Sequence, residues 1–161
     1  MNLLIGDEKE TMCGLEIAVS TDIHDATGIV GAVYTGVYNL LGAQVGVVNS
    51  NSTMLGVQVG AINTSVDETA GIQVGGLNYS SNFVGMQIGA INSVIPDIYS
   101  KMMGFQVGVA NFCPQQSVGI QVGLLNYRSG GSWYSRCIPL LAIRTMRKSK
   151  EETTDESEVQ K

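Results

Sequence analysis

The single histidine of the chain, His24, lies between two acidic residues, Asp22 and Asp25. A histidine between carboxylates could bind a metal ion, or could act as a general base that a carboxylate orients. Either site needs further ligands, and the sequence places no second histidine or partnering cysteine nearby. We therefore interpret this stretch as a solvated loop and expect no metal site.

Three cysteines, Cys13, Cys113 and Cys137, are the candidate nucleophiles. A catalytic thiolate needs a base beside it, and no histidine lies near Cys113 or Cys137 in the sequence. Their odd number and their spacing fit neither a disulfide framework nor a zinc site. We predict free thiols without a catalytic role.

The glycine-rich segments could in principle cradle a phosphate. However, the recurring Gly-x-Gln-x-Gly lacks the Lys and Ser/Thr of a phosphate-binding P-loop, and a single active site would not be copied six times. The paired acids Asp67 and Glu68 occur in one turn only, which is typical of a solvated turn. We predict that the chain is not an enzyme and uses no cofactor.

The strongest pattern is an eight-residue phrase, Gly-x-Gln-[Val/Ile]-Gly-x-x-Asn, whose copies are spaced 14, 15, 14, 19 and 15 residues apart. The six copies begin at Gly42, Gly56, Gly71, Gly85, Gly104 and Gly119. Two degenerate copies, called the worn units below, precede them and begin at Gly14 and Gly28. They have Glu16 and Val30 in place of the Gln. A repeat at nearly constant spacing indicates one structural unit stacked on copies of itself, and worn end copies are typical of caps.

Each unit alternates like a β-strand and then ends in turn-forming residues. In the copy at Gly85, apolar Val84, Met86 and Ile88 alternate with Gly and Gln. We therefore predict an all-β repeat protein, a β-solenoid of about eight coils of 14–15 residues. Stacked coils would place like residues ~4.8 Å apart, where amide side chains can bond to one another. The two predicted ladders, structural or binding, are Gln44, Gln58, Gln73, Gln87, Gln106 and Gln121, and Asn49, Asn63, Asn78, Asn92, Asn111 and Asn126.

The alternative arrangement is an antiparallel meander closed into a β-barrel, with one strand per unit. A strand of that length could span a membrane, with the apolar residues facing lipid. Successive turns, however, do not alternate in character, and there is no aromatic girdle. These features favour the solenoid.

The boundaries follow from where the repeat stops. Residues 1–13 are predicted to be a lead-in, 14–143 a single β-repeat domain, and 144–161 a charged disordered tail. The domain is expected to close on an apolar edge strand within 133–143, because Pro139 cannot donate to a ladder. The one long spacing predicts a corner loop at 96–100.

Charge is scarce in the repeat region: between Ala26 and Tyr127 the charged residues are Asp67, Glu68, Asp97 and Lys101. Without a basic stripe, nucleic acid is not expected as a partner. The repeated amides, if they lined a flat exposed strip, could bind a glycan or protein in register. End coils could pair to form a homo-oligomer, and membrane association is left open.

The repeated phrase resembles the bacterial surface-repeat proteins of the leptospiral type, many of which are lipoproteins. The resemblance covers roughly 14–143, including the closing Ile-Pro-Leu-Leu-Ala-Ile from Ile138. It implies a bacterial origin and an envelope or surface location. No signal peptide and no lipobox around Cys13 are recognised in the sequence, so the alternative location is the cytoplasm. We expect a non-catalytic structural or adhesive binding module of the envelope, with a regular Gln/Asn-lined surface; the alternative is a small outer-membrane β-barrel or pore.

Overall fold

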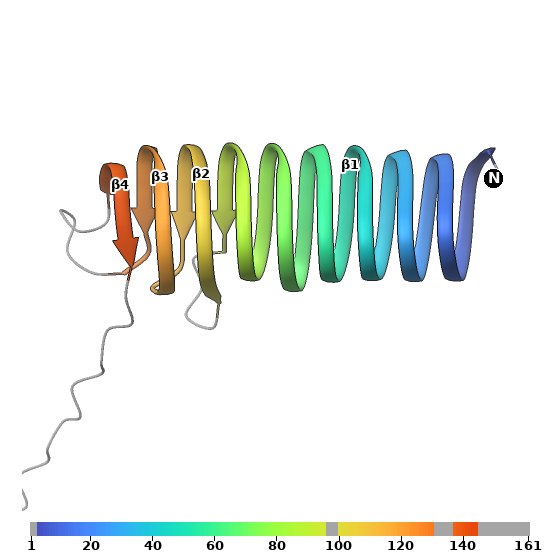
Figure 1. Ribbon diagram of the computed structural model, residues 1–161, viewed down its shortest axis with the longest axis horizontal. Coiled ribbons are helices and arrows are strands. Elements are labelled where there is room, and N and C mark those ends of the chain that lie inside the picture. Colours follow the sequence, from blue (N-terminus) through green and yellow to red (C-terminus); the bar gives the residue numbers. More distant parts are fainter. Residues whose placement is uncertain (1–2, 96–99, 131–136, 145–161) are drawn as a thin grey trace, which may run out of the picture.

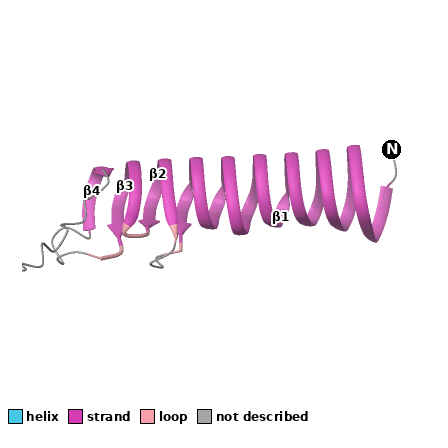
Figure 2. Ribbon diagram, turned by 90° about the horizontal axis from the view of Figure 1, so that it is seen from below, coloured by secondary structure: helices cyan, strands magenta, loops and turns pink. Residues whose placement is uncertain are grey.

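The computed structural model describes residues 3–95, 100–130 and 137–144, and it is a rod of stacked β-coils (Figure 1). The strand β1 (Leu3–Val94) winds through most of the coils, and β2 (Lys101–Cys113) and β3 (Gln116–Arg128) continue the stack. A shorter strand, β4 (Cys137–Arg144), completes the sheet order β1-β2-β3-β4. The view from below shows the same single file of coils (Figure 2). The predicted β-solenoid is confirmed.

Neighbouring coils pair in parallel, and equivalent positions of the repeat lie side by side. Gly85 pairs with Gly104, Gln87 with Gln106 and Asn92 with Asn111. The same three positions continue into the next coil at 119, 121 and 126. Parallel pairing is the solenoid's arrangement and not that of an antiparallel meander. The register also holds across the long spacing, so the extra residues fall between β1 and β2, where 96–99 lie outside the described residues.

The first glycine of each unit turns a corner that other residues cannot turn. Eight of these glycines, from Gly14 to Gly119, have φ between +108° and +151°. A Cβ on Gly71 would also overlap the carbonyl oxygen of Gly56 in the preceding coil. The same overlap recurs at the corner glycine of every coil from Gly28 onward. Glycine therefore recurs at this position because both the backbone conformation and the close stacking of coils require it.

The two ends of the rod are finished differently. β1 begins at Leu3, so the predicted lead-in belongs to the sheet from residue 3 onward. Here Lys9 forms an ion pair with Glu16, the acidic residue in the Gln slot of the first unit. At the other end β4 pairs antiparallel with β3, with a register shift between Gly123 and Asn126. A final antiparallel strand containing Pro139 ends the parallel stack at an edge that is poorly suited to further pairing.

Parts of the sequence predictions fall on residues outside the described ranges. These are 131–136, which include the start of the predicted closing strand, and 145–161, which hold nearly all of the predicted tail. Among the described residues, none belongs to a helix long and apolar enough to cross a membrane.

Candidate functional site

The Gln side chains form one continuous ladder inside the rod. From Gln58 onward, each Gln Nε2 donates to the Gln Oε1 of the preceding coil, for example Gln58 to Gln44 at 2.9 Å and Gln87 to Gln73 at 2.7 Å. The same bond joins the other neighbouring coils as far as Gln121. All six side chains are fully buried. The ladder therefore satisfies, by repetition, amides that would be costly to bury singly.

The Asn side chains form a second ladder that runs in the opposite sense. Asn63 Nδ2 donates 2.8 Å forward to Asn78 Oδ1, in the following coil. Its second proton goes to the main-chain carbonyl of Val74, 2.9 Å away. This double donation repeats from Asn49 to Asn111. Donors of the two ladders thus point toward opposite ends of the rod, and their amide dipoles oppose one another.

The second glycine of each phrase makes room for the backbone of the preceding coil and for the Asn ladder. A Cβ on Gly75 would lie 2.3 Å from the carbonyl oxygen of Gly60 and 2.7 Å from Asn63 Nδ2. A Cβ on Gly89 would meet the carbonyl oxygen of Gly75 and Asn78 Nδ2 at the same two distances. In the two worn units this glycine is replaced by Ala18 and Ala32, and there the Asn is replaced by the shorter threonine. The glycine and the asparagine therefore belong to one packing arrangement.

Threonines and charges end the ladders at the N-terminal side. Thr35 Oγ1 donates to Asn49 Oδ1 at 2.8 Å, which supplies the bond that a preceding Asn would have made. Gln44 Nε2 donates in turn to the main-chain oxygen of Thr35 at 3.1 Å. One coil further out, Glu16 accepts from Thr21 Oγ1 at 2.9 Å and pairs with Lys9. The worn units are thus polar caps whose residues differ because the amide stack stops there.

The other half of the interior contains two more inward rows, and these vary in character. They hold an apolar cluster toward the N-terminus, around Val37, Leu40 and Met54, and another toward the C-terminus, around Phe83 and Met102. Between the clusters lie four buried polar residues. They are Asn51, Ser65, Thr69 and Ser80. The two serines bond to the Gln ladder, whereas Asn51 Oδ1 and Thr69 Oγ1 have no hydrogen-bond partner in the described structure.

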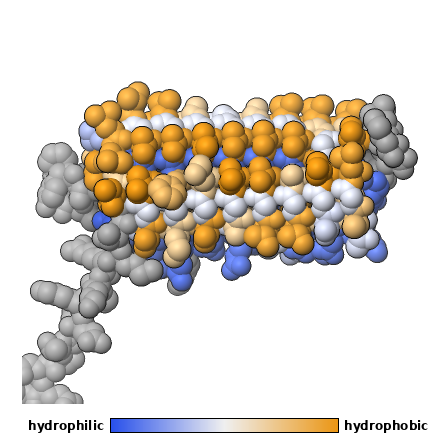
Figure 3. All heavy atoms as spheres, in the orientation of Figure 1, coloured by the Kyte–Doolittle hydropathy of each residue, from blue (hydrophilic) through white to orange (hydrophobic). Residues whose placement is uncertain are grey.

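The outer surface is dominated by aliphatic side chains. Counting each first glycine as position 1, the outward rows are positions 2, 4, 6 and 7 and the residue just before the next first glycine. From Leu41 to Leu125 these rows hold only Ala, Val, Ile, Leu, Met, Phe and Gly76. We call these five rows the aliphatic face, and Figure 3 shows apolar rows running along the rod. Its more exposed members include Val47, Leu55, Val84, Val109 and Leu124.

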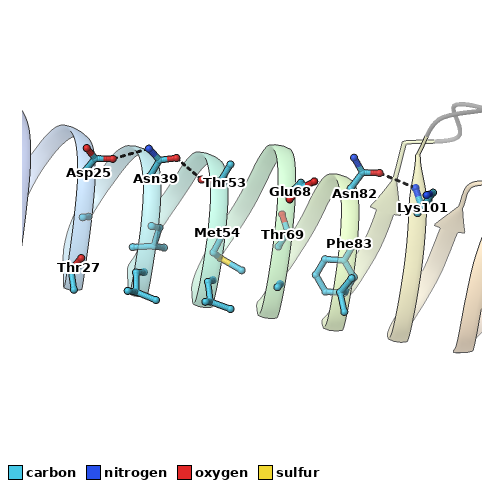
Figure 4. A pocket seen from close by; sticks show the side chains of 16 residues that line it. Asp25, Thr27, Asn39, Thr53, Met54, Glu68, Thr69, Asn82, Phe83 and Lys101 are labelled. Carbon is cyan, nitrogen blue, oxygen red and sulfur yellow. Dashed lines mark hydrogen bonds between the residues drawn. The ribbon is translucent and has the colours of Figure 1, made fainter.

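A polar edge borders the aliphatic face (Figure 4). It is formed by the residue three before each first glycine, and it is continuous from Asp25 through Asn39 to Thr53. Asn39 Nδ2 donates 2.7 Å to Asp25 Oδ1, and Thr53 Oγ1 donates 2.5 Å to Asn39 Oδ1. Glu68, Asn82 and Lys101 continue the row along an open groove of about 710 Å³.

The histidine and the cysteines that were considered as catalytic or metal-binding residues lie apart from one another. His24 is exposed, contacts Asp25 Oδ2 at 3.2 Å and stacks on Tyr38 with a centroid distance of 4.8 Å. The bond from Asn39, and then that from His24, lowers the pKa of Asp25 below its ordinary value. Cys13 and Cys137 are exposed, and Cys113 is buried in the C-terminal apolar cluster. No group of His, Cys, Asp and Glu suited to a metal ion occurs among the residues that the structure describes.

The structure corrects the expected position of the amides. All twelve Gln and Asn residues predicted as a ladder are buried, so they do not line an exposed strip that a partner could touch. The alternation of each strand correctly separates two faces, but the amide face is turned inward because stacked amides satisfy one another. The surface left for partners is the aliphatic face with its polar edge, and it was visible in the sequence as rows of Val, Ile and Leu at the repeat spacing.

Comparison of the chain with protein-family models, with curated proteins and with solved structures gave no match in any of the three.

Proposed function

We propose that this chain is a non-catalytic structural and adhesive module of a bacterial cell envelope, and that it binds through the repeated outer rows of the solenoid. The observation that carries the proposal is the contrast between a closed interior and a repeated exterior. The inward amides bond to one another, so the feature that extends along the whole rod and stays free to bind is the outer surface. The envelope location is proposed because the repeated phrase resembles that of bacterial surface-repeat proteins.

The filled interior also weighs against a pore. A conducting pore needs a water-filled lumen, whereas Gln87, Asn92 and their equivalents occupy the inside of the described coils. We therefore do not propose a pore as a second function.

Fractionation of a bacterium that carries the chain, followed by detection with a specific antibody, tests the location. We expect the protein in the envelope fraction, and recovery in the soluble cytoplasmic fraction would contradict the proposal.

Removing two whole units tests whether the repeated surface does the binding. Deletion of 56–84 joins Leu55 to Gly85 in the same phase of the repeat, so that the rod is shortened while its surface pattern is kept. We expect the shortened rod to sediment with envelope preparations more weakly than the full chain, but still to bind. Unchanged binding, or complete loss in a folded protein, would indicate one local site instead.

A further inference from the structure

The aliphatic face covers more of the rod than one flat partner can reach. It extends from the residue before each first glycine to position 7, which is eight of the fourteen positions of a coil. It therefore turns two corners: one at the first glycine, where Gly71 has φ +142°, and one between positions 6 and 7. A surface that wraps around corners needs a partner that can wrap with it.

A second copy of the rod would cover too little of this surface. One flat side, positions 2 to 6, is about 15 Å wide, and eight coils stack to about 35–40 Å. Face-to-face pairing would bury roughly 500–600 Å² on each copy, whereas a standard stable interface buries ~800 Å² on each partner. Position 7 and the pre-glycine row would stay exposed to water. A regular face also gives no unique register, since sliding by one coil restores the same contacts.

Charges avoid the aliphatic face completely within the described coils 14–95 and 100–128. The one charged residue on the same side of the coil, Glu16, points inward and is buried. The other charged side chains in these coils include Asp22, Asp25, Glu68 and Lys101, and all of them lie on the remaining arc. Such a division between a wide apolar face and a charged face is typical of an element that lies in a membrane interface.

Aromatic residues mark the border between the two arcs. Tyr79, Phe112 and Tyr127 share position 9, one residue beyond the buried Asn. The rings of Phe112 and Tyr127 are 6.0 Å apart, so they form an adjacent pair on the last two parallel coils. Tyrosine is favoured at membrane–water interfaces because its ring is apolar and its hydroxyl is polar.

The backbone of the rod also suits contact with hydrocarbon along its sides. The pairing of coils joins each strand to the next along the rod axis, as between Gly85 and Gly104. Within the paired strands that the structure describes, the backbone groups therefore bond to the neighbouring coils. Hydrocarbon cannot bond to peptide groups, so a surface without free peptide groups is required wherever lipid contacts the chain.

We propose that the aliphatic face inserts into the hydrocarbon of one bilayer leaflet, so that the rod lies in the membrane plane. The remaining arc of each coil, here called the charged arc because it carries the charged side chains, then lies in water. This inference rests on the proposed function and names lipid acyl chains as the partner. The depth expected for such an in-plane element is ~5–10 Å. Because the charged arc carries more acids than bases, the binding is driven by apolar burial and does not need anionic lipid.

Flotation of the full chain with phosphatidylcholine vesicles tests the inference. The charged variant V47E/V109E places two acids on the aliphatic face, at side chains 51% and 55% exposed. The matched control S52E/S81E adds the same charge on the opposite arc. We expect wild type and control to float with the vesicles, and the partition coefficient of V47E/V109E to fall about tenfold or more. Circular dichroism establishes that each variant folds. If V47E/V109E does not fold, the shape-conserving V47T/V109T replaces it, with a fall of about threefold expected.

Three results would overturn the lipid assignment. In the first, wild type stays with the soluble fraction as a monomer. In the second, V47E/V109E and S52E/S81E float equally well. In the third, wild type is a soluble dimer by light scattering that V47E/V109E dissociates, which identifies a second copy as the occupant. Each of these results leaves the envelope location and the repeat-dependent binding to be judged by their own experiments.

The depth of a side chain in the bilayer can also be measured by tryptophan quenching. A purely structural role of the aliphatic face would not produce quenching by lipid. With Trp133 replaced by Phe, a tryptophan is introduced at Val47 in one protein and at Ser52 in another. Lipids brominated on their acyl chains should quench the first and not the second. Equal quenching at both positions would overturn the proposed orientation.

Discussion

The two halves of the interior obey different rules. In one half the Gln and Asn rows are invariant from Gln44 to Asn126, and each amide bonds to its equivalents in the neighbouring coils. In the other half the residues change from coil to coil, from Leu40 and Met54 through Thr69 to Phe83. A side chain that bonds to its own kind cannot change alone, whereas a side chain that packs by shape can. The repeated phrase in the sequence therefore reflects the positions that hydrogen-bond between coils, and not the positions that pack by shape.

The corner that joins the two halves should be the most sensitive position. Gly71→Ala places a methyl group at φ +142° against the carbonyl of Gly56, so we expect the free energy of unfolding to fall by about 3–5 kcal/mol. Urea denaturation measures the change. Gly31→Ala is the matched control, because its new Cβ would meet nothing closer than 3.7 Å. We expect that variant to stay within about 1 kcal/mol of wild type, and equal losses in both variants would refute the account of the corner.

Breaking one rung of the amide half should have the next largest effect. Gln87→Leu removes the donor from residue 87 to Gln73 Oε1 and the side-chain acceptor of Gln106 Nε2, both in a buried setting. We expect a loss of about 1–3 kcal/mol in the free energy of unfolding. An unchanged melting temperature would show that the ladder is not the stabilising element described above.

Replacing an unpartnered hydroxyl in the other half should increase the free energy of unfolding. Thr69 Oγ1 is buried without a partner in the described structure, so Thr69→Val keeps the shape and removes an unsatisfied group. We expect a gain of about 1 kcal/mol. The control is Ser80→Ala, since Ser80 Oγ donates to Gln73 Oε1 at 3.0 Å and its loss should destabilise by about 1 kcal/mol. Thermal unfolding of both variants checks the pair, and a loss for Thr69→Val would contradict the contrast between the halves.

The smallest effect is expected outside both halves, on the polar edge. The pKa of Asp25 is lowered from its ordinary 3.8 by the bond from Asn39 and then by His24. The stabilisation from the ionised carboxylate is therefore fully present above pH 3.8 and is lost as the pH falls through the lower, folded-state pKa. Melting temperatures from pH 5 to pH 2 should show a slightly shallower decline for Asp25→Asn than for wild type. A steeper decline for the variant would reverse the assigned sign.

The sequence predicts the stacking well and the orientation poorly. The 14–15-residue spacing of Gly and Gln predicts in-register coils, and the amide ladders follow from that register. Alternation divides each strand into two faces without saying which is inside. The ladders were predicted to be structural or binding, and their burial fits the structural role. The amide-lined outer surface of the binding role does not form in the described coils, because stacked Gln and Asn bond to one another inside the rod.

The ends of the rod were harder to predict for a related reason. Leu3 to Cys13 contains no copy of the glycine phrase, yet it is part of β1. Its inclusion depends on tertiary contacts, namely Lys9 with Glu16 and the packing of Met12 against the N-terminal apolar cluster. The bonds of Ser65 and Ser80 to Gln73 have a signal in the sequence, because a serine follows both Gln58 and Gln73 at a spacing of seven residues.

The most direct test of the buried amide half is proton exchange of the side-chain amides themselves, followed by NMR after transfer to D₂O. The account predicts that the NH₂ groups of Gln58, Gln73 and Gln87, and of their Asn counterparts, exchange as slowly as the backbone amides of the same coils. The exposed side chain of Gln115 serves as the internal control and should exchange at once. Exchange of the ladder amides as fast as that of Gln115, in a protein whose backbone is protected, would contradict the central claim.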